Sequence, residues 1–69
     1  MEEKNIMDIE VVTLNELIES GKTVRLIFVN GYQENVRLLD FGEETILVED
    51  MKGERKLVYI HAVSTIAMG

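Results

Sequence analysis

The spacing of hydrophobic residues changes once along this chain, close to Gly21. Before Gly21, apolar residues recur at steps of three and four, as on one face of an α-helix: Met7, Val11, Leu14, Leu17 and Ile18. We expect a helix over about residues 8–20, because glycine tolerates the left-handed conformation that ends many helices. Its start is open, since Asp8 offers a cap for a longer helix, and Thr13 begins a capping box with Glu16 for a shorter one.

After Gly21 the pattern alternates, with Val24, Leu26 and Phe28 on one face of a strand. Asn30-Gly31 predicts a type I′ hairpin turn, because both residues tolerate positive φ. Five strands are expected, at about residues 22–30, 34–40, 45–50, 54–60 and 63–67. The fold class is therefore mainly β: a single domain over residues 1–69, with an N-terminal α-helix and a small, strongly bent, five-stranded antiparallel barrel.

The chain is short for a self-sufficient domain. With 69 residues, it buries only about 60% of the surface that its unfolded form exposes. It contains no cysteine, so neither a disulfide framework nor a thiolate metal site is available, and no cofactor is predicted. Oligomerisation is the remaining common support for a domain of this size.

The net charge of −6 opposes general nucleic-acid binding, which depends on lysine and arginine neutralising phosphates. The charge is unevenly placed. Residues 1–21 hold six acidic residues and one lysine, a net charge of −5, whereas the rest of the chain has a net charge of −1. The acidity therefore belongs to the predicted helix.

Two further patterns bear on location. No apolar run approaches the roughly 18 to 20 residues of a membrane span. The acidic start, with Glu2 and Glu3, lacks the basic region of a secretory signal. We expect a cytoplasmic protein with no membrane contact.

No catalytic or metal site is predicted. His61 has no carboxylate or serine partner at a telling spacing, so a structural or pore-lining role is favoured. Glu43 and Glu44 are neighbours in a turn, and their side chains should point apart. Residues 50–53 form a turn without the alternating acidic ligands that calcium needs. The sequence does not predict an enzyme.

Four segments, in order and at similar spacing, resemble the Hfq family of bacterial Sm-like proteins. Leu14-Asn15-Glu16-Leu17 resembles the helix segment, Val29-Asn30-Gly31 the first Sm motif, Phe41 the aromatic residue that follows it, and Tyr59-Ile60-His61 the Tyr-Lys-His signature. The resemblance covers about residues 8–67. It implies a ring-forming RNA-binding protein.

The resemblance implies a homo-oligomeric ring, with six subunits in the family, in which the fourth strand of one subunit pairs with the fifth strand of the next. A short sheet with two open edges removes both by head-to-tail pairing that closes on itself. The subunit interface is then expected at Leu57, Tyr59, Val63, Ser64, Thr65 and Ile66.

On the helix-bearing face of the family, called the proximal face, uridine-rich RNA binds around a pore lined by the Lys-His pair. This chain keeps His61 but has Ile60 in place of the lysine and Glu44 in place of a nearby aromatic residue. Acidic helices on the same face would repel phosphates. Proximal binding at Ile60 and His61 is therefore disfavoured.

The opposite, or distal, face binds purine-rich single-stranded RNA in the family, and this chain preserves its residue types better. The positions implied are Ile27, Phe28, Gly31, Tyr32, Gln33, Asn35 and Thr65. Aromatic stacking on bases does not depend on net charge. Phe28 is favoured as a core residue over a base platform, whereas Tyr32 is expected to be exposed. Val36 replaces a family glycine that lets the second strand bend.

The sequence therefore predicts an Hfq-like ring that binds single-stranded RNA, purine-rich before uridine-rich, mainly on its distal face. In the family such rings are RNA chaperones in post-transcriptional regulation. One alternative is an Sm-fold assembly or protein-interaction module that has lost RNA binding, with its acidic face serving a basic protein. Another is a paralogue that disrupts or mixes rings.

Overall fold

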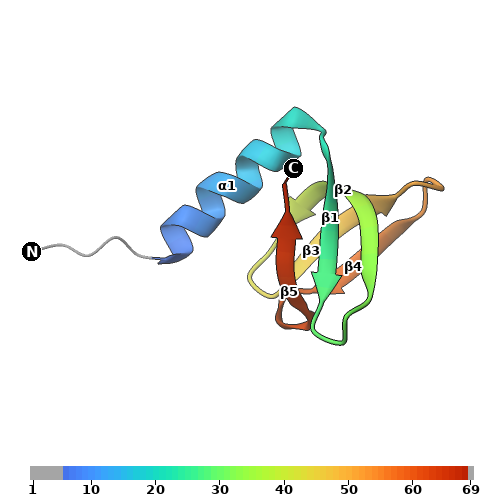
Figure 1. The fold of residues 1–69 in the computed structure, drawn as a ribbon. Helices are drawn as coiled ribbons and strands as arrows, with labels where there is room; N and C mark the ends of the chain where they lie inside the picture. The colour runs from blue at the N-terminus through green and yellow to red at the C-terminus, as the bar shows by residue number, and fades with distance from the viewer. Residues whose placement is uncertain (1–5, 69) are drawn as a thin grey trace, which may run out of the picture.

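The computed structural model describes residues 6–68, with side-chain surroundings from Val11 onward. Over these residues, one helix precedes five strands (Figure 1). The elements are α1 (Ile6–Ser20), β1 (Thr23–Phe28), β2 (Gln33–Phe41), β3 (Thr45–Asp50), β4 (Arg55–Tyr59), the 3-10 helix η1 (Ile60–Ala62) and β5 (Val63–Ala67). The strands form one antiparallel sheet in the order β4-β3-β2-β1-β5. The predicted mainly-β class is confirmed.

The C-terminus of α1 is held by local hydrogen bonds. Gly21 has a φ of +68°, and its N–H donates to the Leu17 carbonyl oxygen at 3.2 Å. The Ser20 hydroxyl donates to the same oxygen at 3.0 Å. Thr13 lies inside the helix, so the shorter helix predicted from its capping box is wrong. No glycine or proline interrupts residues 6–13, and helix growth is cheap once a turn has formed.

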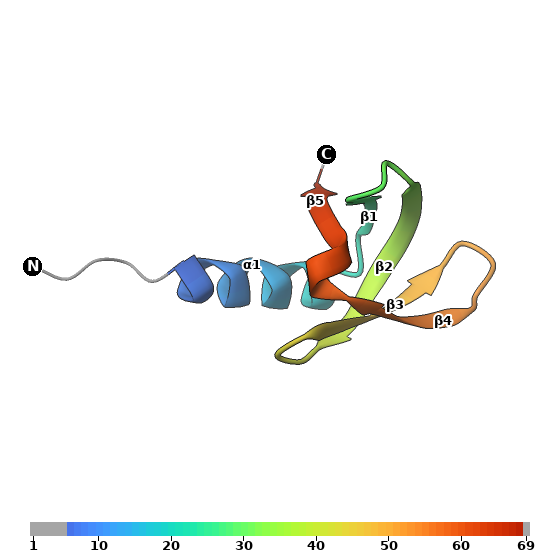
Figure 2. The same cartoon turned by 90° about the horizontal axis from the view of Figure 1, so that it is seen from below.

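The C-terminal half of α1 packs on the sheet. Leu17 is buried, and Leu14 and Ile18 contact the core in part. Val11 was predicted on the inward face but is 41% exposed, because the first turns of α1 project away from the strands (Figure 2). Met7 was also predicted on the inward face, but it lies outside the residues whose side-chain surroundings the structure describes.

The core consists of alternate strand residues that point inward. With Leu17, its buried members are Val24, Leu26, Val36, Leu38, Ile46, Val48 and Val58. Val36 is 0% exposed, so the residue that replaces the family glycine fills the core. The β2–β3 register shifts between Leu38 and Asp40, and such a bulge bends and twists a strand locally. The bend of β2 therefore coincides with this bulge and not with a glycine at position 36.

The β1–β2 turn differs from the predicted type I′ turn. Gly31 has a φ of +92°, whereas no non-glycine residue of the described chain has a positive φ. The Gly31 N–H donates to the Phe28 carbonyl at 2.8 Å, and the Phe28 N–H donates to the Tyr32 carbonyl at 2.8 Å. Asn30 accepts the Tyr32 N–H on Oδ1 at 3.0 Å. This is a three-residue loop with glycine in the left-handed position.

The β3–β4 turn repeats this arrangement. The Gly53 N–H donates to the Asp50 carbonyl at 3.0 Å, the Asp50 N–H donates to the Glu54 carbonyl at 2.8 Å, and Gly53 has a φ of +87°. Asp50 Oδ1 accepts the N–H groups of Lys52 and Glu54, each at 2.9 Å. The Asp50 side chain therefore stabilises its own turn.

Two strand ends also differ from the expected ranges. β1 ends at Phe28, because Val29 to Gly31 form the turn. β4 ends at Tyr59, and η1 follows it directly. The alternation in the sequence does not reveal η1, since three residues are too few to show a helical period.

Candidate nucleic-acid interface

A pocket of about 280 Å³ lies between the start of β2 and the β3–β4 turn. We call it the turn pocket. It is lined by Tyr32, Glu34, Asn35, Asp50, Met51, Lys52, Glu54 and Lys56. β2 pairs with β3 from Val36↔Asp50 onward, so residues 33–35 lie past the end of β3 and leave this space open.

Tyr32 provides an aromatic surface at this pocket. Its side chain is 59% exposed, as the sequence suggested. Its ring centroid lies 5.8 Å from that of Phe28, at a tilt of 53°. Phe28 is partly buried and packs against the core, which favours the core role expected for it. Phe28 therefore packs beside the Tyr32 ring, and more than half of Tyr32 remains accessible.

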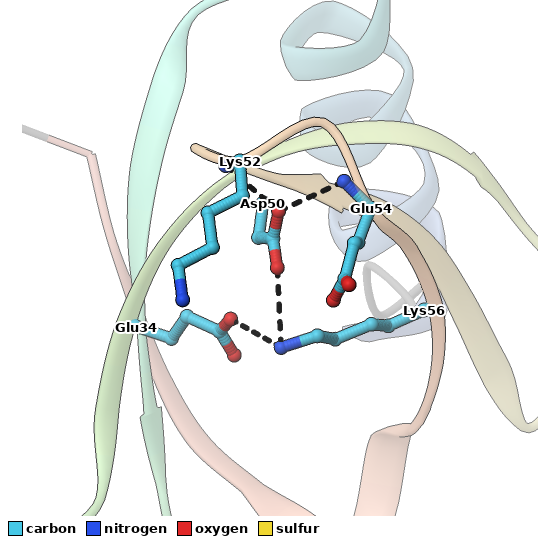
Figure 3. Close-up of polar contacts among 5 residues, drawn as sticks. All are labelled: Glu34, Asp50, Lys52, Glu54 and Lys56. Atoms are coloured by element: carbon cyan, nitrogen blue, oxygen red, sulfur yellow. Dashed lines mark hydrogen bonds and ion pairs between the residues drawn. The ribbon is translucent and has the colours of Figure 1, made fainter.

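The polar part of the turn pocket is a charged triad of Glu34, Asp50 and Lys56 (Figure 3). The Lys56 ammonium nitrogen lies 2.7 Å from Glu34 Oε2 and 3.4 Å from Asp50 Oδ2. Each residue continues the inward side-chain row of its strand by one step beyond the core: Glu34 before Val36 in β2, Asp50 after Val48 in β3, and Lys56 before Val58 in β4. Two carboxylates and one ammonium group therefore close this end of the barrel.

The surroundings of the triad shift two pKa values. The backbone N–H of Glu54 stabilises the Asp50 carboxylate and, with the Lys52 N–H and the Lys56 ammonium, lowers the pKa of Asp50 below its ordinary 3.8. The hydrogen bond to Glu34, together with Asp50, raises the pKa of Lys56 above its ordinary 10.5. Both shifts favour the charged forms found in the triad.

Asp50→Asn should lower stability near neutral pH, because asparagine keeps an oxygen for the turn but loses the ion pair with Lys56. Because the pKa of Asp50 is lowered in the folded state, its carboxylate stabilises the fold above pH 3.8. This stabilisation is lost as the pH falls through the lower folded-state pKa. The difference between variant and parent should therefore shrink in acid. Urea-unfolding midpoints against pH, at fixed protein concentration, measure this difference. Glu43→Gln, which removes an exposed turn carboxylate, is the matched control; an equal, pH-independent loss in both variants would contradict the assignment.

The other distal positions form a second group on the outward face of the sheet. Strand pairing places Ile27 opposite Gln33 on one side and opposite Thr65 on the other, and paired residues share a face. We call Thr65, Ile27 and Gln33 the distal row. Asn35 is the next outward residue of β2 and also lines the turn pocket. Of the predicted distal residues, Tyr32 and Asn35 thus line the turn pocket, and Ile27, Gln33 and Thr65 form the distal row. Gly31 lies in the β1–β2 turn, and Phe28 packs partly against the core.

The proximal positions are also neighbours. Ile60 and His61 lie on η1, and the Ile60 N–H donates to the Glu44 carbonyl at 2.8 Å. Ile60 packs partly against the core, whereas Glu44 and His61 are exposed. The His61 ring lies 5.8 Å from the Tyr59 ring. The backbone bond between Glu44 and Ile60 thus brings an exposed glutamate to the chain segment that carries His61.

The terminal strands of the sheet, β4 and β5, are its open edges. In β4, Leu57 and Tyr59 are 61% and 55% exposed. The Glu54 carbonyl and the Ile60 N–H bond toward β3. Because backbone direction alternates along an antiparallel strand, the N–H and C=O groups of Leu57 point away from β3. The β4 edge therefore offers apolar side chains and free backbone groups together.

A groove of about 300 Å³ lies beside the β5 edge, between α1 and the sheet. We call it the edge groove. Its apolar lining includes Leu14, Leu17, Ile60, Ile66 and Met68. Four of the predicted interface residues line it: Val63, Ser64, Thr65 and Ile66. Predicted interface residues thus lie on both open edges, with Leu57 and Tyr59 on β4.

The sequence reasoning missed the charged triad. The signal that points to it is the alternation of the strands themselves, since residues 34, 50 and 56 fall on the inward face although each is charged.

Within residues 6–68, no helix has the length and apolarity needed to cross a membrane.

An N-terminal helix on a strongly bent five-stranded antiparallel sheet with two open edge strands defines a small Sm-like domain. The family model described as Hfq protein matches residues 10–69. The chain belongs to the Hfq family.

Individual relatives agree with this assignment. The RNA-binding protein Hfq of Geobacillus sp. (strain WCH70) is 38% identical over 64 residues, which is 93% of this chain and 85% of that protein. The RNA-binding protein Hfq of Natranaerobius thermophilus is 36% identical over 66 residues, 96% of this chain and 77% of that protein. The 1.55 Å crystal structure of the pleiotropic translational regulator Hfq has a similar fold, with a TM-score of 0.82 at 23% identity, covering 87% of this chain and 98% of that one.

Proposed function

We propose that this chain assembles into a ring and binds single-stranded RNA, mainly on its distal face, as an RNA chaperone in post-transcriptional regulation. Relatives that share most of its length carry the name RNA-binding protein Hfq. The observation that carries the proposal is the exposed Tyr32 ring beside a pocket of about 280 Å³. An accessible aromatic ring stacks on bases whatever the net charge of the protein.

The two open edges support the ring. The β4 edge presents Leu57 and Tyr59, and the β5 edge lies beside the apolar edge groove. Pairing β4 of one subunit with β5 of the next would cover both and would add buried apolar surface to a domain with a small core. We expect six copies, the number that the family resemblance implies.

The difference between the two faces supports distal binding. At the proximal positions, Ile60 brings no positive charge and Glu44 brings a negative one. The exposed Glu16 and Glu19 of α1 add to this acidity. A phosphate backbone gains affinity mainly from lysine and arginine contacts, so the proximal face lacks its usual attraction. The distal residues instead offer stacking and hydrogen-bonding groups.

Oligo-A should bind more tightly than oligo-U, with a shallow salt dependence, because stacking and not phosphate neutralisation supplies the affinity. Fluorescence-anisotropy titrations at several salt concentrations measure both quantities. His61→Ala should leave oligo-A binding unchanged and serves as the control. Tight oligo-U binding that is lost in His61→Ala would reverse the assignment of the faces.

The second candidate is an Sm-fold interaction module that has lost RNA binding. It is favoured by the acidic residues of α1 and by the pairing of Lys56 with two carboxylates, which keeps that ammonium from phosphates. A stable ring that binds neither oligo-A nor oligo-U would select this candidate. Its partner would then carry a basic surface.

A further inference from the structure

The turn pocket holds a carboxylate oxygen, Glu34 Oε1, that accepts no hydrogen bond from the described residues and lies beside a charged donor. Asp50 is fully engaged, because Oδ1 accepts two backbone N–H groups and Oδ2 faces Lys56. Glu34 accepts from Lys56 on Oε2 at 2.7 Å. Among the described residues, Glu34 Oε1 has no hydrogen-bond partner, and it lines the pocket beside the Lys56 ammonium. Figure 3 shows these groups side by side.

The backbone adds to this polar surface. The Tyr32 carbonyl bonds to β1, so by alternation the N–H and C=O groups of Asn35 point away from β1, toward the side where β3 has ended. Within residues 6–68, no β3 residue pairs with Asn35. The pocket thus combines a carboxylate acceptor, an ammonium donor and the outward-facing Asn35 N–H, with Tyr32 in its lining.

We propose that the Glu34–Lys56 pair makes the turn pocket selective for guanine. This inference rests on the proposed distal binding of RNA. Guanine carries two neighbouring donors on its Watson–Crick edge, N1–H and the N2 amino group, next to the acceptor O6. Glu34 accepts one donor on Oε1 and the other on the remaining lone pair of Oε2, while the Lys56 ammonium donates to O6.

The other bases match this pair less well. Adenine offers one amino group beside the acceptor N1, which would face the carboxylate with a lone pair. Uracil offers one N–H between two carbonyl oxygens, which the same carboxylate would repel. The pocket volume of about 280 Å³ suits one base stacked on Tyr32. Because the pairing is charge-assisted, its selectivity should exceed that of stacking, which every base provides.

The test compares an oligo-A probe with the same probe carrying guanine at every third base, by fluorescence anisotropy on the unaltered chain. The guanine-containing probe should bind about tenfold more tightly, within the range of one good bidentate base contact. A third probe with inosine, which lacks the N2 amino group, should lie between the two. Spacing the guanines avoids four-stranded guanine structures.

Glu34→Gln should abolish the preference for guanine while oligo-A binding persists. An amide has one acceptor oxygen and an NH₂ donor, so it cannot face both guanine donors with acceptor oxygens. Glu43→Gln is the matched control, because it removes the same charge from an exposed turn residue that does not line the pocket. Its preference should stay unchanged. The comparison of probes on the unaltered chain does not depend on how well any variant folds.

The outcomes separate this inference from the proposed function. Oligo-A binding without a gain from guanine, or a gain that survives in Glu34→Gln, would overturn the guanine assignment and leave distal RNA binding standing. Binding of none of the probes would overturn both. Equal loss of guanine preference in Glu43→Gln and Glu34→Gln would show a general charge effect and would also overturn the role of Glu34.

Discussion

Leu57→Pro is expected to be a folded monomer, whereas the unaltered chain is expected to form the proposed ring. The Leu57 N–H points away from β3, toward the position where β5 of the next subunit would pair. Proline removes that donor without breaking a β3–β4 hydrogen bond, and an edge strand tolerates proline when the missing N–H faces outward. Leu57 is exposed, so the core loses nothing. Light-scattering mass at micromolar concentration measures the assembly, and circular dichroism checks the fold.

Leu57→Ala is the matched control, because it removes most of the same side chain but keeps the N–H. It should weaken the ring less than proline does. Val63 is a poorer site for this test, since its N–H already donates to the Ile60 carbonyl within η1, and proline there would disturb the subunit itself. A ring that survives Leu57→Pro would show that β4 is not the assembling edge. A monomeric parent chain would refute the ring and favour the ring-disrupting paralogue.

Tyr32→Ala should weaken oligo-A binding by about 1–3 kcal/mol per stacked base, roughly five- to 150-fold in affinity. The side chain is more than half exposed and holds no core position, so the variant should keep its fold and its ring. Anisotropy titrations with oligo-A at fixed salt give the loss, and light-scattering mass confirms the assembly.

Tyr32→Phe separates stacking from hydrogen bonding, because it keeps the ring and removes the hydroxyl. Its affinity should stay close to that of the parent chain. If Tyr32→Ala binds oligo-A as well as the parent does, the turn pocket is not a base site. The distal row of Thr65, Ile27 and Gln33 would then be the remaining candidate on this face.

Local patterns predicted the end of α1 and the alternation of the strands, because a helix stop and a period of two depend on neighbouring residues. They failed where several local solutions compete. At the β1–β2 turn, Asn30 satisfies the Tyr32 N–H with its side chain, and Gly31 supplies the one positive φ of that loop. At the helix start, two plausible caps were present, and the helix continued through both.

The sequence by itself determined that this protein is a small helix-plus-barrel domain, and that its two most C-terminal strands carry apolar residues suited to pairing. These properties follow from hydrophobic periodicity, which is local. The tertiary structure alone decided that Glu34, Asp50 and Lys56 meet at one end of the core and that Tyr32 lies beside them. Residues 34, 50 and 56 come from three different strands, and the register of those strands, with the curvature of the sheet, brings their charges within ion-pair distance.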